Sequence, residues 1–99
     1  MQRVVKYYID DVKQMIQDYG WSKEEVLGLE LDYSFKVIFT LIGEDNQVDK
    51  YKLTDYEGNK IPLSSINGYE RGLLMNCYSH FEKGKENLKG VVKIEESER

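Results

Sequence analysis

The sequence predicts an α+β fold, in which an antiparallel β-meander (about residues 34–63) and a C-terminal strand are packed by two amphipathic helices. Three observations predict it. Apolar residues occupy every odd position from 29 to 41, the period of a strand with one buried face. The segments at about 4–19 and 67–83 carry apolar residues at three- and four-residue steps, as amphipathic helices do. Short polar turns separate the strand-like segments, which favours antiparallel pairing.

Size and composition predict one domain over residues 1–99. The chain has 99 residues, 32% charged and 40% hydrophobic, with a net charge of −4. No apolar run reaches the roughly 20 residues of a membrane helix, and the N-terminus lacks the apolar core of a secretory signal. We therefore expect a cytoplasmic protein without membrane contact. One cysteine rules out an internal disulfide.

The first predicted helix, at about 4–19, ends before Gly20, a residue suited to a left-handed cap. A short second helix is predicted from Ser22, because Glu25 completes a capping box, and Gly28 ends it. The apolar stripe of the first helix consists of Val5, Tyr8, Ile9, Val12, Met15, Ile16 and Tyr19.

The meander follows. A bend is predicted near residues 32–34, because one straight strand over the whole alternating run would protrude from a domain of this size. The core strand then runs over about 34–42, and residues 48–54 pair back, with Tyr51 and Leu53 inward and Lys50 and Lys52 outward. Polar turns are predicted at 43–47 and 55–59. A short strand at 60–63 closes the meander, and Pro62 places it at an edge or ends it there, because proline donates no ladder hydrogen bond.

The second long helix is predicted to begin after Asn67, which has capping-box spacing to Glu70, with Ser64 or Ser65 as competing caps. It should end at Lys83 with Gly84 as its cap. A last strand is predicted at 91–94, followed by a frayed charged tail at 95–99.

Cys77 and His80 are the one pair of residues with catalytic potential. They lie three residues apart on a predicted helix and could form a thiolate–imidazole pair. Cys77 lies in the apolar stripe, however, where cysteine behaves as a small hydrophobe. We therefore predict that the protein is not an enzyme and has no catalytic residues.

No metal or cofactor is predicted. Asp45, Gln47 and Asp49 alternate as in a calcium loop, but the glycine and glutamate that such a loop requires are missing. The glycines match no nucleotide-binding motif. A cluster of four lysines gives a weak alternative, direct nucleic-acid binding, in an otherwise acidic chain; these are Lys83, Lys85, Lys89 and Lys93.

The predicted partner site is an acidic surface with an exposed tyrosine on the meander turns, extended by aspartates of the first helix. Residues 44–57 hold five carboxylates against two lysines, which would attract a partner with a basic surface. The predicted contact residues are Glu44, Asp45, Asp49, Asp55, Tyr56, Glu57, Asp10, Asp11 and Asp18.

The small size, the acidity, the tyrosine and lysine content and the single proline resemble the composition of many phage and mobile-element proteins. These include inhibitors of bacterial defence enzymes, of the anti-CRISPR and anti-restriction classes. The resemblance implies a binding protein that occupies the basic groove of a nucleic-acid-processing enzyme. The alternatives are a self-associating structural or accessory protein, for example a homodimer, and a small enzyme using Cys77 and His80.

Overall fold

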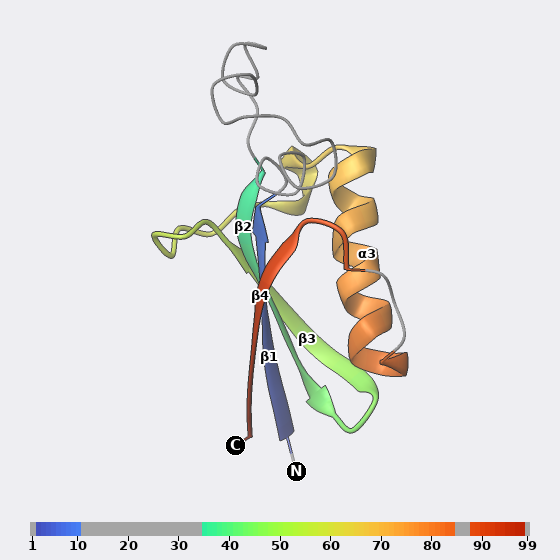
Figure 1. Ribbon diagram of the computed structural model, residues 1–99. Coiled ribbons are helices and arrows are strands. Elements are labelled where there is room, and N and C mark those ends of the chain that lie inside the picture. Colours follow the sequence, from blue (N-terminus) through green and yellow to red (C-terminus); the bar gives the residue numbers. More distant parts are fainter. Residues whose placement is uncertain (1, 11–34, 85–87, 99) are drawn as a thin grey trace.

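The computed structural model describes residues 2–10, 35–84 and 88–98, and shows an α+β fold with a four-stranded antiparallel sheet and one α-helix (Figure 1). The elements are β1 (Gln2–Asp10), β2 (Lys36–Glu44), β3 (Gln47–Thr54), the 3-10 turn η1 (Leu63–Ser65), α3 (Gly68–Lys83) and β4 (Val91–Glu98).

The sheet order is β3-β2-β1-β4, so the first strand lies in the interior. β1 pairs with β2 on one side, where Val5 is opposite Leu41, and with β4 on the other, where Lys6 is opposite Glu95. The described sheet therefore has two edge strands, β3 and β4.

The core lies between one face of the sheet and α3, which runs along that face (Figure 1). Tyr7 and Leu41 from the two central strands and Cys77 from the helix are fully buried in it. The other buried members of this cluster are Val5, Ile9, Phe35, Val37, Phe39, Leu53, Ile66, Leu73, Leu74 and Phe81.

The predicted helix at about 4–19 is wrong over residues 4–10, which belong to β1. Val5, Tyr7 and Ile9 alternate toward the core, whereas Tyr8 lies on the opposite face against Tyr56. β1 has apolar groups on both of its faces. Together with the residues that follow in the sequence, these groups recur at three- and four-residue steps, which is the pattern of an amphipathic helix. The rest of this helix, the short helix from Ser22 and the bend at 32–34 lie outside the described residues.

The first hairpin of the meander is confirmed. β2 and β3 pair antiparallel through a turn at 45–46, with a bulge beside Gly43. A side chain at Gly43 would lie 2.0 Å from the carbonyl oxygen of Gln47, so the bulge requires glycine. The predicted strand at 60–63 is wrong, because only the Thr54–Lys60 bridge forms before the chain turns into η1.

The helix predicted at 67–83 is confirmed as α3. The Asn67 side chain accepts a hydrogen bond from the backbone N–H of Glu70 (2.9 Å), and the Glu70 carboxylate accepts one from the N–H of Asn67 (2.6 Å). Gly84 ends the helix in the left-handed region, at φ 70°.

The last strand is longer than predicted. β4 continues through the acidic residues to Glu98, because basic side chains of β1 lie opposite them. Arg3 forms an ion pair with Glu96 (Nε to Oε1, 2.6 Å). The same guanidinium donates to the carbonyl oxygens of Phe81 and Asp45, and lies 4.3 Å from the centre of the Phe81 ring. Arg3 thus joins β1, β4, the β2–β3 turn and the end of α3.

Candidate protein-binding site

The candidate site is the outer edge of β3. Beyond β3, the chain pairs briefly with the outer edge through the Thr54–Lys60 bridge, with the N–H of Ile61 donating to the carbonyl of Leu53 (3.0 Å) and the N–H of Asp55 donating to the carbonyl of Asn59 (2.9 Å). Pro62 has no N–H, and η1 begins at the next residue. Pairing along this edge therefore stops after Ile61.

The backbone of Tyr51 is the next ladder position along the edge. The Leu53 carbonyl points outward, because it accepts from Ile61. Backbone groups of alternate residues in a strand point to the same side, so the N–H and C=O of Tyr51 point outward as well. This geometry is that of an edge strand able to accept a further strand.

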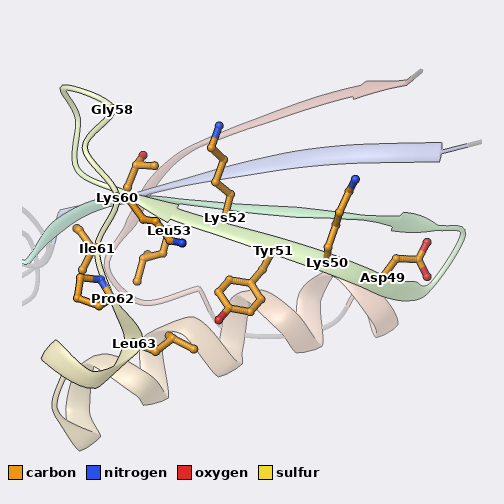
Figure 2. A pocket seen from close by; sticks show the side chains of 11 residues that line it. Asp49, Lys50, Tyr51, Lys52, Leu53, Gly58, Lys60, Ile61, Pro62 and Leu63 are labelled. Atoms are coloured by element: carbon orange, nitrogen blue, oxygen red, sulfur yellow. The ribbon is translucent and has the colours of Figure 1, made fainter.

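A groove of about 760 Å³ lies along this edge, between residues 49–54 of β3 and residues 58–63. Figure 2 shows its two sides. Lys50 and Lys52 project away from α3, whereas Tyr51 and Leu63 lie on the side of the helix.

A second groove, of about 370 Å³, adjoins the first on the helix side, and the two share Tyr51 and Leu63. Its walls are apolar apart from Arg71. Met75 and Tyr51 are both more than half exposed, at 60% and 51%. The residues lining it are Phe39, Tyr51, Leu63, Ile66, Arg71, Leu74, Met75 and Tyr78. We call β3 with its two grooves the β3-edge surface.

The β3-edge surface is basic, although the chain is acidic. Its grooves contain four basic side chains and one acidic side chain, a formal charge of +3, in a chain with a net charge of −4. The basic residues are Lys50, Lys52, Lys60 and Arg71, and the acidic one is Asp49. An acidic partner therefore fits this surface better than a basic one.

The structure divides the predicted acidic contact residues between the two ends of β3. Glu44 and Asp45 lie at the β2–β3 turn, and Asp49 follows near the start of β3. Asp45 has a positive φ of 46° and its carbonyl accepts from Arg3, so its conformation serves the turn. Asp49 lies in the basic groove beside Lys50.

The second group is at the other end of β3. The Asp55 carboxylate accepts from the N–H groups of Glu57 and Asn59 and from the Asn59 side chain, at 2.8 to 3.0 Å, and the Asn59 hydrogen bonds lower its pKa. Tyr56 donates to the carbonyl of Ile9 (3.2 Å) and is packed edge-on against Tyr8, which brings the turn near Asp10. Burial is the main cause of the raised pKa of Tyr56.

Asp11 and Asp18 lie outside the described residues. Because Asp49 and Asp55 are six residues apart on one strand, about 20 Å separates the two groups. Among the described residues, the predicted acidic contacts thus lie in two small groups at opposite ends of β3.

Cys77 and His80 have different surroundings. The Cys77 thiol is fully buried, and burial raises its pKa to about 12, so it is protonated at neutral pH. His80 is engaged elsewhere, since its Nδ1 is 2.9 Å from the hydroxyl of Tyr7 and the two rings meet edge-to-face. This arrangement supports a packing role for both residues.

The lysines of the nucleic-acid alternative are not brought together where the structure describes them. Lys83 ends α3, near the Arg3 end of the sheet, whereas Lys89 lies beside Gly90, whose carbonyl accepts from Asp10 at the opposite end. Lys93 forms an ion pair with Glu95 (2.7 Å), whose hydrogen bond raises the pKa of Lys93. Lys85 lies outside the described residues.

Sequence reasoning placed Lys50 and Lys52 outward and noted the edge character of Pro62, but did not combine them. Lys60 and Arg71 were missed as site residues, because they join the lysines only when the 58–63 segment and α3 fold beside β3. The available signal was Pro62, which limits strand pairing along this edge because proline has no N–H.

Within residues 2–10, 35–84 and 88–98, no group of three histidine, cysteine or acidic side chains could hold a metal ion. Over the same residues, no helix is long and apolar enough to cross a membrane. Comparison of the chain with family models, curated proteins and solved structures found no match.

Proposed function

We propose that this chain is a protein-binding module that acts without catalysis, and that the β3-edge surface is its binding element. The observation that carries the proposal is the interrupted ladder: pairing along β3 stops at Pro62, while a groove continues beside the outward backbone of Tyr51. Strand addition to such an edge is a recurring mode of peptide recognition.

Two further features support the proposal. The apolar groove beside Tyr51 exposes large side chains of the type enriched at interfaces, and tyrosine is prominent among binding hot spots. The protonated, buried thiol of Cys77 supports binding over nucleophilic catalysis.

The test uses Tyr51→Pro, which removes an outward N–H and a candidate anchor. Proteins retained by the immobilised wild-type chain are identified and purified, and their affinities for the variants are then measured by calorimetry. Tyr51→Pro should weaken binding at least about 30-fold, the effect of losing a hot spot of roughly 2 kcal/mol. Tyr51→Ala tests the side chain alone.

Lys36→Ala is the control, because it removes an exposed charge from β2 that lines neither groove, and it should leave the affinity within about threefold. A partner that binds Tyr51→Pro and Tyr51→Ala as tightly as wild type would overturn the proposal. Turnover that requires Cys77 or His80 in a folded protein would also overturn it.

A second candidate is the inhibitor function implied by composition, with docking on the basic groove of a nucleic-acid-processing enzyme. The observation that favours it is the anchoring of Tyr56, whose hydroxyl is fixed on Ile9 while its ring stays 42% exposed beside Glu57. For this candidate function, Glu57→Lys is the test variant and Tyr51→Pro is the control. Glu57→Lys should slow association with the enzyme, more so at low salt, whereas Tyr51→Pro should have no effect.

A further inference from the structure

Building on the proposed function, we propose that the β3-edge surface binds an extended segment of another protein in which acidic and apolar residues alternate. The segment adds antiparallel to β3 and continues the ladder that Pro62 interrupts.

The backbone sets the direction. Residues 60–61 already run antiparallel to the end of β3, with Lys60 opposite Thr54. A strand that takes the next outward position pairs with Tyr51 and lies in the groove between β3 and the 58–63 segment. Its length is limited to a few residues, because the bulge between Ile42 and Gly43 distorts β3 around Asp49.

The side chains set the chemistry. Successive residues of the added strand point to opposite faces of the sheet. The residue opposite Tyr51 points toward α3 and enters the apolar groove beside Leu74 and Met75. Its two neighbours point the other way, beside Lys50 and Lys52 (Figure 2), where acidic side chains form favourable cross-strand pairs.

The charges also decide between occupants. A second copy that paired through its own β3 would place Lys50 and Lys52 against the same lysines, which is unfavourable. β4 of a second copy is acidic, but two of its three glutamates, Glu95 and Glu96, are already paired with Lys93 and Arg3 of their own chain. A foreign acidic–apolar strand meets neither obstacle.

The probe is a synthetic peptide of alternating glutamate and valine, seven residues long and capped at both ends. It is titrated into the isotope-labelled full chain and followed by backbone amide chemical shifts. A lysine–valine peptide is the charge control. A glutamate–valine peptide that is N-methylated at alternate residues, and so lacks ladder donors, is the backbone control.

We expect shift changes confined to β3, residues 58–63 and the groove-lining part of α3. The acidic peptide should bind roughly tenfold more tightly than the lysine peptide, the combined effect of two cross-strand charge pairs. N-methylation should abolish binding. The variant Lys50→Glu/Lys52→Glu should reverse the preference, and Lys36→Ala, which lies outside both grooves, should leave it unchanged.

The inference is overturned if the acidic peptide does not bind, binds no better than the lysine peptide, or shifts residues away from β3. It is also overturned if the chain alone shows concentration-dependent shifts at β3, because a second copy then fills the edge. The proposed function fails separately, when Tyr51→Pro leaves a natural partner's affinity unchanged. If a natural partner's affinity falls in Tyr51→Pro but the chain shows no preference for an acidic strand, the acidic-strand inference is overturned and the proposed function stands.

Discussion

The two edges of the described sheet treat their charged side chains in opposite ways. On β4, two of the three glutamates have partners within the chain: Glu96 pairs with Arg3, and Glu95 pairs with Lys93 and accepts from the Tyr8 hydroxyl (3.1 Å). On β3, Lys50 and Lys52 form no ion pair with any residue of the described parts of the chain. Edge lysines of this kind discourage pairing between like edges.

The difference indicates a division of roles. Charges on the β4 edge hold the first and last strands together and should contribute to stability. Lys50 and Lys52 on the β3 edge form no ion pair that would stabilise the described fold. We expect them to contribute to the choice of binding partner instead. Substitutions on the two edges test that division.

Replacing Arg3 by alanine should cost about 2–3 kcal/mol of unfolding free energy, because charge-assisted hydrogen bonds and a cation–π contact are lost together. Urea denaturation measures this. Lys36→Ala is the control, since its ion pair with Asp10 is long (3.9 Å) and half exposed, and should cost under about 0.5 kcal/mol. Equal losses in the two variants would contradict the role of Arg3.

The Cys77 thiol should react with a disulfide reagent at pH 8 at least about 100-fold more slowly in the folded than in the unfolded protein, because burial raises its pKa to about 12. Arg3→Ala should speed this reaction by loosening the end of α3 from the sheet. Lys50→Glu/Lys52→Glu should leave the rate unchanged. Fast labelling of the wild-type thiol would show that the helix face opens readily.

The stability of the β4 edge should fall in acid. The hydrogen bond from Lys93 holds the pKa of Glu95 below its usual value. A carboxyl with a lowered pKa in the folded state stabilises above its unfolded pKa, and that contribution is lost as the pH falls through the folded value. The melting temperature should therefore decrease below about pH 4.5, and Glu95→Gln should flatten the profile. An unchanged profile would contradict the pairing.

Reversing the two lysines of the β3 edge should hardly affect the fold. Lys50→Glu/Lys52→Glu should change the unfolding free energy by less than about 0.5 kcal/mol, because both side chains are exposed and unpaired among the described residues. The matched reversal on the other edge, Glu95→Lys/Glu96→Lys, should lower the unfolding free energy by more than this, because it replaces two ion pairs by like charges. A larger loss on the β3 edge would contradict the division of roles.

Local patterns predicted α3 and the β2–β3 hairpin well. The Asn67–Glu70 capping box and Gly84 mark α3 at both ends, and the alternation through Phe39 and Leu41 marks β2. The capping residues and the alternating pattern both lie within a few residues of the helix or strand that they predict.

The errors concern structure that depends on distant partners. β1 is a strand because it pairs with β2 and with β4, which lies more than 80 residues away. Glu96 and Glu98 belong to a strand because Arg3 lies beside them. The candidate site was missed for the same reason, since Arg71 and Lys60 come close to β3 only in the folded chain. The local charge of the sequence favoured an acidic surface instead.

The position of β1 also has a consequence for synthesis of the chain. β1 leaves the ribosome about 80 residues before β4, the strand that covers its second edge, so the described sheet stays incomplete until residues 91–98 have emerged. Until then β1 presents an unpaired edge with the large side chains Tyr7 and Ile9 on its buried face. A chain that stops before residue 91 would keep this edge, which makes premature termination a route to aggregation.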